Sequence, residues 1–202
     1  MNKEYRRYRA LYAFLRVVLY PFFRIRIIGR ENIPPGGAMI CPNHTSFWDP
    51  IFLAIGAGID NHMRYMGKEE LFKVPMLGKI YNAVGSFSVA RGKSDIAAVR
   101  TAMALLRKGE KVVIFPEGTR VRGGNTVSAK QGAVRIADQV GVPVVPVYIS
   151  AKKRLFGRSY VIFGKPYYVN PEKEKLSGEE YLRRAEALME TIRTLGKRAE
   201  GT

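Results

Sequence analysis

Short apolar segments alternate with helical segments along most of this chain, and this alternation constrains the fold more than any other feature. Five segments have the length and the β-branched or aromatic content of strands: 38–42, 86–90, 111–115, 143–149 and 160–163. Strands separated by helices are typical of a mostly parallel sheet with helices packed on its faces. The chain has 202 residues, which suits one hydrophobic core better than two. We therefore predict a single α/β domain with a central, mostly parallel sheet flanked by helices.

The helical segments carry their own boundary signals. A serine three residues before Gln or Glu is the pattern of a capping box, and a glycine is the commonest residue just after a helix. Two helices carry the capping-box pattern: one between the Ser128–Gln131 pair and Gly141, and one after the Ser177–Glu180 pair. A third, between Ser94 and Gly109, is marked by a serine cap and a glycine alone. We expect each helix to begin directly after its serine or capping pair.

The first 24 residues differ in character from the rest. As a helix, this segment gathers its apolar side chains on one stripe: Tyr8, Leu11, Tyr12, Leu15, Val18, Leu19 and Phe22. Arg16 and Pro21 interrupt the apolar stretch, so it is a poor membrane span and a poor signal peptide. We predict that 1–24 is an amphipathic helix in a membrane interface and that 25–202 is the folded domain. The alternative is a helix that packs on the domain's own core.

The charge of the chain restricts its partners. Thirty-four Lys and Arg residues against seventeen Asp and Glu residues give a formal net charge of +17. Such a surface attracts nucleic acid, anionic lipid, or an acidic substrate or carrier protein. The single cysteine, Cys41, excludes an internal disulfide and a metal site built on cysteines. Its place in a strand predicts a role in the apolar core.

One of the two histidines, His44, stands directly after the first predicted strand. Asp49 and Pro50 follow it and have the composition of a helix start. A spacing of five residues between His44 and Asp49 suits no regular helix face. A turn between a strand and a helix can nevertheless fold the histidine back to the aspartate, which gives a base with a carboxylate partner. In the alternative interpretation, Asp49 only caps the helix and His44 only bonds to backbone.

Polar residues also follow two more of the predicted strands. Arg91 comes after the second strand segment, and Glu117, Thr119 and Arg120 come after the third. The carboxyl ends of parallel strands meet at one edge of a sheet, where open α/β sheets bind ligands. A base, two arginines and a glycine turn at one edge suit proton abstraction from a substrate with an anionic group. Taken singly, each arginine is more typical of a solvated surface.

Two motifs at these strand ends match a known family. Residues 43–49 read NHTSFWD and residues 115–120 read FPEGTR, which fit the Asn-His-x4-Asp and Phe-Pro-Glu-Gly-Thr-Arg motifs of the glycerolipid acyltransferases. The chain resembles this family from about residue 29 to 164, and it is most similar to the bacterial 1-acyl-sn-glycerol-3-phosphate (lysophosphatidate) acyltransferases. It departs from the family in AKQGA, where Phe-Lys-x-Gly-Ala is usual. The resemblance implies a glycerol-phosphate acyltransferase-like α/β fold.

The resemblance also implies a role for each matching residue. His44 would be the general base, and Asp49 would orient it. Further residues would form the acceptor site: Lys68, Arg91, Glu117, Gly118, Thr119 and Arg120. The two arginines would hold the acceptor phosphate, because a guanidinium forms two directional, charge-assisted hydrogen bonds with it. No metal and no cofactor are implied, and the co-substrate would be acyl-CoA or acyl-carrier protein.

The activity implied by the resemblance is transfer of a fatty acyl group from a thioester to the sn-2 hydroxyl of lysophosphatidate, which gives phosphatidic acid. Histidine suits proton abstraction, since a typical imidazole titrates near pH 6.5. Backbone N–H groups in the turn after His44 or near Gly118 would stabilise the oxyanion. We expect a peripheral or monotopic protein at the cytoplasmic face of the cell membrane, with an anionic bilayer as partner and no nucleic acid.

Three alternatives stay open from the sequence. The acceptor could be glycerol 3-phosphate or another lysolipid. A non-catalytic basic module that binds membrane or nucleic acid would explain the charge, but it would leave both motifs unexplained. A hydrolase with Ser46 as nucleophile lacks the G-x-S-x-G pattern around that serine.

Overall fold

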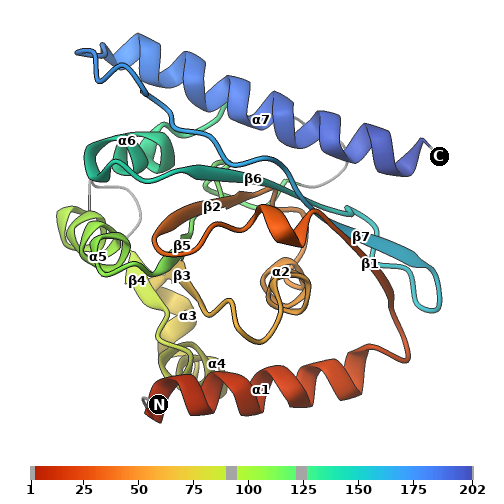
Figure 1. Ribbon diagram of the computed structural model, residues 1–202. Coiled ribbons are helices and arrows are strands. Elements are labelled where there is room, and N and C mark those ends of the chain that lie inside the picture. Colours follow the sequence, from red (N-terminus) through yellow and green to blue (C-terminus); the bar gives the residue numbers. More distant parts are fainter. Residues whose placement is uncertain (1–2, 90–94, 122–126, 202) are drawn as a thin grey trace.

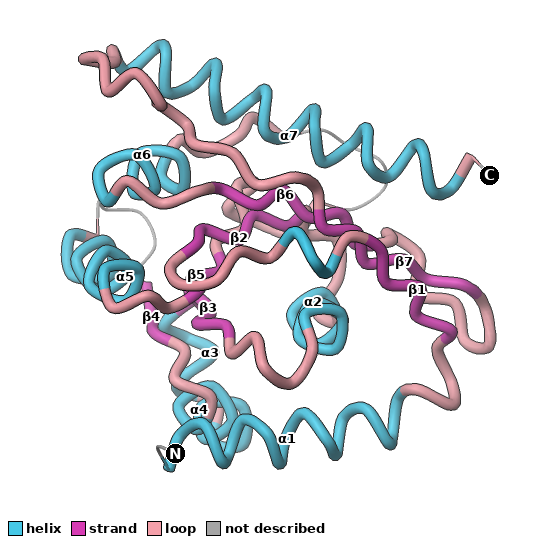
Figure 2. The backbone as a smooth tube through the Cα atoms, in the orientation of Figure 1, coloured by secondary structure: helices cyan, strands magenta, loops and turns pink. Residues whose placement is uncertain are grey.

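The computed structural model describes residues 3–89, 95–121 and 127–201, and these form one α/β domain (Figures 1 and 2). Seven strands make one sheet in the order β1-β7-β6-β2-β5-β3-β4. The strands are β1 (Arg24–Ile28), β2 (Ala38–Pro42), β3 (Met63–Lys68), β4 (Phe87–Val89), β5 (Lys111–Val113), β6 (Val144–Ile149) and β7 (Arg158–Phe163). Neighbouring strands are parallel except β6 and β7, which are antiparallel. The predicted fold class is confirmed.

Helices cover both faces of the sheet. They are α1 (Lys3–Leu19), α2 (Asp49–Ala57), α3 (Glu69–Lys73), α4 (Pro75–Ala83), α5 (Ile96–Arg107), α6 (Gly132–Val140) and α7 (Gly178–Glu200), with a 3-10 turn η1 (Arg30–Asn32). Figure 1 shows α5, α6 and α7 on one face, and α2 on the other face between the sheet and α1. Helix α1 contacts α2 and α4. It therefore forms an outer layer over α2.

Each face of the sheet has its own apolar core. Phe52, Leu53 and Phe163 lie fully buried on the α2 side, and Met39, Leu106 and Leu188 lie on the side of α5 to α7. Each such side chain stabilises the fold by about 1.5–3 kcal/mol through burial. Strand β2 is buried along its whole length, because both faces are covered. Cys41 is fully buried in the second core, as its place in the strand predicts.

Two strands, β1 and β3, were missed by the sequence analysis. Arg64 interrupts the apolar pattern of β3, and Arg24 and Arg26 interrupt that of β1. Arg64 is nevertheless only 8% exposed, because its guanidinium pairs with Glu110 and with Glu4 of α1. Pairing of this kind allows a charged side chain inside a strand.

The predicted helix boundaries are confirmed in part. Ser177 and Glu180 form a capping box on α7. The Ser128–Gln131 pair does not cap α6: Gln131 is itself the N-cap residue, and its side-chain oxygen accepts a hydrogen bond from Arg135 Nε at 3.1 Å. Helix α5 is capped by Asp95, whose carboxylate accepts the Ala98 N–H, whereas Ser94 lies outside the described residues.

The N-terminal helix is shorter than the predicted 1–24 and ends at Leu19, two residues before Pro21. Tyr8, Tyr12 and Leu19 are buried, which agrees with packing on the domain, whereas Phe14 and Val17 are 62% and 74% exposed. Among the described residues, no helix combines the length and the hydrophobicity that crossing a bilayer requires. Membrane association of this segment stays a prediction.

Candidate active site

The turn between β2 and α2 is fixed at both ends. At its start, the buried side chain of Asn43 bonds twice to the backbone of Ile149: Nδ2 donates to the carbonyl oxygen at 2.9 Å, and Oδ1 accepts the N–H at 2.7 Å. This pair joins the carboxyl end of β2 to that of β6. At the other end, α2 begins at Asp49, with Trp48 rather than Asp49 in the N-cap position. Asp49 therefore lies one residue further into the helix than predicted.

His44 and Asp49 are in contact, although five residues separate them. His44 Nδ1 lies 2.9 Å from Asp49 Oδ2, and the aspartate side chain is fully buried. The same oxygen accepts the backbone N–H groups of Thr45 and Ser46, each at 2.7 Å. The carboxylate can only accept, so Nδ1 carries the proton and Nε2 is the basic nitrogen. No hydrogen bond to Nε2 is found within the described part of the chain.

The N–H groups of this turn are already used by the protein. Thr45 and Ser46 donate to Asp49, and His44 donates to Glu117. These three groups do not point at a reacting carbonyl, which disfavours them as the oxyanion donors suggested by the sequence. The Ser46 hydroxyl accepts the Trp48 N–H at 3.2 Å and, within the described part of the chain, forms no hydrogen bond with the His44 ring. That geometry lacks the Ser–His contact of a serine hydrolase.

The loop after β5 supports the imidazole from the other side. The Phe115 ring stacks on the His44 ring with centroids 4.1 Å apart and planes 27° apart. Glu117 Oε2 accepts the His44 backbone N–H at 2.8 Å, and the Val121 N–H donates to the His44 carbonyl oxygen at 2.8 Å. FPEGTR and NHTSFWD, far apart in sequence, thus form one structure. Its effect is to fix the position of the imidazole ring.

Glu117 is unusual because the residue is only 7% exposed, although its side chain is ionisable. Burial raises the pKa of Glu117 to about 7, the His44 N–H opposes this change, and the nearby charge of Asp49 adds to it. Protonated and ionised forms are therefore both populated near neutral pH. In this structure Glu117 braces the backbone of His44.

The other predicted acceptor residues in this loop lie near its surface. Gly118 has φ 64°, a left-handed conformation that glycine adopts without strain, and Thr119 is exposed. The Arg120 guanidinium lies 3.4 Å from the centroid of the Phe47 ring, and Phe47 itself is 63% exposed. Stacking on this ring restricts the guanidinium to the rim of the site.

Lys68 is the last residue of β3, one of the outer strands of the sheet. Met63 of β3 and Ala38 of β2 are both level with Lys111 of β5, so five residues further along, Lys68 is level with Asn43. Two strand spacings, about 10 Å, separate the two positions. Arg91 comes after β4 but lies outside the described residues.

Asp49 has a second charged partner, Lys153, which the sequence analysis missed. Lys153 follows β6, and its Nζ contacts Asp49 Oδ1. Burial alone would raise the pKa of Asp49, but the hydrogen bond to His44 and the charge of Lys153 lower it below its ordinary value. The rule that revealed Arg91 and Glu117 also directs attention to the loop after β6, but it does not distinguish Lys153 from the neighbouring Lys152 and Arg154.

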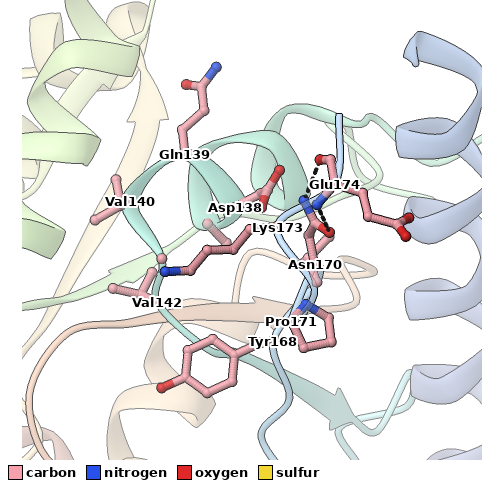
Figure 3. A pocket seen from close by; sticks show the side chains of 12 residues that line it. Asp138, Gln139, Val140, Val142, Tyr168, Asn170, Pro171, Lys173 and Glu174 are labelled. Carbon is pink, nitrogen blue, oxygen red and sulfur yellow. Dashed lines mark hydrogen bonds between the residues drawn. The ribbon is translucent and has the colours of Figure 1, made fainter. Parts of the chain in front are cut away.

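A hollow lies away from these residues. It has a volume of about 800 Å³ and is lined by the end of α6 and by the loop after β7 (Figure 3). It opens beside Val142, where β6 begins, whereas His44 lies beyond the carboxyl end of β2. Its Asn170 amide is bonded to the Glu174 backbone rather than aimed into the hollow. None of the predicted site residues lines it.

Comparisons with known proteins show similarity to acyltransferases. A family model described as Acyltransferase matches residues 24–150. A 1-acyl-sn-glycerol-3-phosphate acyltransferase of Bacillus subtilis is 32% identical over 187 residues, which cover 90% of this chain and 92% of the relative. The chloroplastic 1-acyl-sn-glycerol-3-phosphate acyltransferase LPAT1 of Arabidopsis thaliana is 35% identical over 135 residues, 65% of this chain but only 37% of the relative.

A solved structure shows the same fold. The crystal structure of the 1-acyl-sn-glycerophosphate (LPA) acyltransferase PlsC from Thermotoga maritima superposes with a TM-score of 0.72 at 24% identity, and it covers 98% of this chain and 80% of that one. The family model includes both motifs and every strand from β1 to β6. The chain therefore belongs to the Acyltransferase family.

Proposed function

We propose that the protein transfers a fatty acyl group from a thioester to the sn-2 hydroxyl of 1-acylglycerol 3-phosphate. One observation carries this proposal: His44 bonds to the buried Asp49 through Nδ1, which leaves Nε2 as a base at the carboxyl edge of the sheet. The names of the Bacillus subtilis and Arabidopsis thaliana relatives support the same acceptor. Glycerol 3-phosphate and other lysolipids are the alternative acceptors, and the assay below compares them.

The reaction requires no protein nucleophile, because the thioester is already activated. His44 Nε2 takes the proton of the acceptor hydroxyl while its oxygen attacks the thioester carbonyl. Asp49 stabilises the resulting imidazolium, as the aspartate of a Ser-His-Asp triad does. The tetrahedral oxyanion then collapses, the carbon–sulfur bond breaks, and the thiolate leaves with the proton from His44. The products are phosphatidic acid and a free thiol.

Residues at the rim of the site suit the acceptor phosphate. The proposal assigns Arg120 and Arg91 as its ligands, with Lys68 as a further cation. Arg120 supports this assignment best: its guanidinium is stacked on Phe47, and the following N–H, of Val121, bonds to the His44 carbonyl. A guanidinium fixed this close to the base can hold a phosphate with directional bonds. Glu117, Gly118 and Thr119 would shape the loop around it.

We also propose that the protein acts at an anionic bilayer. Residues 5–30 contain seven arginines and no acidic residue, and residues 139–171 contain five basic residues and no acidic one. Strands β1 and β7 lie within these two segments and are paired, with Arg24 opposite Arg158. Arg24 and Arg26 of β1 and Arg158 of β7 thus place positive charge along this side of the sheet, where it favours anionic lipid.

The exposed apolar side chains of this region lie at the edge that carries the active site. β1 and β7 run opposite to β2, so the turn before β1 and the β6–β7 loop are at the carboxyl end of β2. Leu155 and Phe156 in that loop are 62% and 60% exposed, and the Phe156 ring contacts Phe22 at 5.9 Å between centroids. A bilayer against this edge would bring a lipid acceptor to His44. The cytoplasmic face of the cell membrane, and acyl-CoA or acyl-carrier protein as donor, are part of the same proposal.

The test is release of free thiol from a long-chain acyl-CoA in the presence of lysophosphatidate, glycerol 3-phosphate or another lysophospholipid. We expect release that depends on lysophosphatidate and falls by roughly 10²–10⁴-fold in His44→Ala, the usual contribution of a general base. Ser46→Ala is the matched control in the same turn and retains activity. Release without any acceptor that survives in His44→Ala would overturn the proposal, and activity only with another lysolipid would reassign the acceptor.

A further inference from the structure

Lys153 reaches the catalytic pair from the β6–β7 loop. Its side chain is only 5% exposed, its Nζ contacts Asp49 Oδ1, and it lies 3.3 Å from the hydroxyl oxygen of Thr45. The ammonium also lies 5.9 Å from the centroid of the Phe52 ring. Lysine is rarely buried to this extent unless its charge is paired. The contact with Asp49 supplies that pairing.

The two carboxylate oxygens of Asp49 therefore have different partners. Oδ2 accepts from His44 and from the backbone of Thr45 and Ser46, whereas Oδ1 faces Lys153. A buried carboxylate with a permanent cation on one oxygen stays ionised. It also interacts less strongly with a second cation on the other oxygen, because its charge is already balanced and because like charges repel.

We propose that Lys153 is a positioning residue that sets the pH range in which His44 acts as a base. The ammonium keeps Asp49 ionised, which holds the proton of His44 on Nδ1 and leaves Nε2 free. The same ammonium opposes positive charge on the imidazole, so His44 stays neutral, and thus basic, at lower pH than it would beside Asp49 alone. This inference rests on the proposed function, in which neutral His44 accepts the hydroxyl proton.

The other ionisable groups near His44 and Asp49 are present in the wild type and in every Lys153 variant. Glu117, from the loop after β5, accepts the His44 N–H, and Arg193 of α7 acts on Glu117 and lowers its pKa. Arg120 lies on the Phe47 ring at the rim. Because these groups are unchanged, a difference between Lys153 variants reports the charge at that position.

The first experiment measures kcat/KM against pH for Lys153→Met and Lys153→Arg, with the exposed Lys175→Met as control. Methionine keeps the length of the side chain and removes its charge. We therefore expect the acidic limb of the kcat/KM profile to move to higher pH by about one unit, which is the usual effect of one nearby charge on a pKa. We expect kcat to fall by at least about tenfold, within the range that a general base contributes. Lys153→Arg keeps the charge and leaves the limb in place, and Lys175→Met changes neither quantity.

A second measurement does not depend on turnover. The chain has two histidines, so an NMR titration of their ring signals is simple, and the spectrum of His44→Ala identifies which signal belongs to His44. We expect the midpoint of that signal to rise in Lys153→Met and to stay unchanged in Lys153→Arg. If the wild type failed to transfer acyl groups to any lysolipid, the proposed function would fail while this titration still decided the role of Lys153.

A double-mutant cycle separates positioning from folding. Lys153→Met leaves a buried carboxylate with one partner fewer and can lose its fold, whereas Asp49→Asn/Lys153→Met has neither buried charge. If Lys153 acts through Asp49, kcat of the double variant equals that of Asp49→Asn alone. A further loss in the double variant would overturn the proposal. The proposal would also be overturned if the acidic limb of the pH profile and the His44 titration midpoint both stayed in place in folded Lys153→Met. An equal shift of these two quantities in Lys153→Arg would overturn it as well.

Discussion

A single buried carboxyl group, that of Glu117, connects the stability of this protein to pH. It accepts the His44 backbone N–H, and its pKa is raised from 4.5 to about 7, chiefly by burial. Folding therefore favours the protonated form. The stabilisation from that form is complete below pH 4.5 and is lost as the pH rises through about 7.

We predict that Glu117→Gln removes this loss. Glutamine remains neutral and still accepts the His44 N–H, so the free energy of unfolding at pH 8 should exceed that of the wild type by up to about 3 kcal/mol. Urea unfolding between pH 4 and pH 8 measures the difference, which should close below pH 4.5. Glu174→Gln, at an exposed position, is the control. The same pH dependence in wild type and Glu117→Gln would contradict the prediction.

The contact between His44 and Asp49 could be predicted from the sequence, but its environment could not. His44 and Asp49 stand at a strand-to-helix turn, and that turn allows contact across an irregular spacing. Lys153 is separated from Asp49 by more than a hundred residues and belongs to a run of basic residues that is typical of a solvated loop. Only the order of β2 and β6 in the sheet brings it to the aspartate.

At the scale of elements, two copies of one sequence pattern have different outcomes. Ser177 with Glu180 caps α7: the serine hydroxyl accepts the Glu180 N–H at 3.2 Å, and the glutamate accepts the Ser177 N–H at 2.6 Å. Ser128 with Gln131 has the same spacing, but Ser128 is exposed and α6 begins four residues later, at Gly132. A neighbouring residue, Lys130, bonds through its N–H to the Pro116 carbonyl of the active-site loop. Tertiary contact thus overrides the local capping signal.

We predict that this difference is measurable. Ser177→Ala should lower the free energy of unfolding by about 1 kcal/mol, the usual effect of losing a helix cap. Ser128→Ala is the matched control and should leave it within about 0.5 kcal/mol of the wild type, as for other surface substitutions. Denaturant unfolding of both variants provides the comparison. Equal destabilisation by the two substitutions would show that Ser128 caps α6 in solution.

The strands show the same limit of local information. Apolar segments gave β2, β5, β6 and β7 with small errors at their ends, because these strands are covered on one or both faces. β3 has no such segment, since Arg64 and Lys68 interrupt it. Arg64 can be buried there because Glu4 and Glu110, from other parts of the chain, form ion pairs with its guanidinium. That information is not present in the local sequence.

At the scale of the whole molecule, charge and shape indicate one face for contact with a bilayer. The two segments without acidic residues meet at the β1–β7 pair, and the turn that holds His44 and Asp49 lies at the carboxyl end of β2, where β1 begins. The Phe23 and Trp48 rings lie 6.1 Å apart between centroids, which links the start of β1 directly to that turn. Attraction by the basic residues and insertion of apolar side chains should both contribute to binding.

We predict that Leu155→Ser/Phe156→Asn weakens binding to phosphatidylglycerol vesicles by at least about tenfold, because burial of each apolar side chain is worth about 1.5–3 kcal/mol. Asparagine suits position 156, where φ is 58°. Flotation with vesicles measures binding, and higher salt should weaken that of the wild type as screening increases. Tyr168→Ser removes an exposed aromatic ring beyond the opposite edge of the sheet and should have no effect.

If the double variant bound as tightly as the wild type, the β6–β7 loop would not enter the bilayer, and α1 would have to supply the contact. If the protein bound acyl-carrier protein but not vesicles, the basic face would instead be a docking surface for the acyl donor.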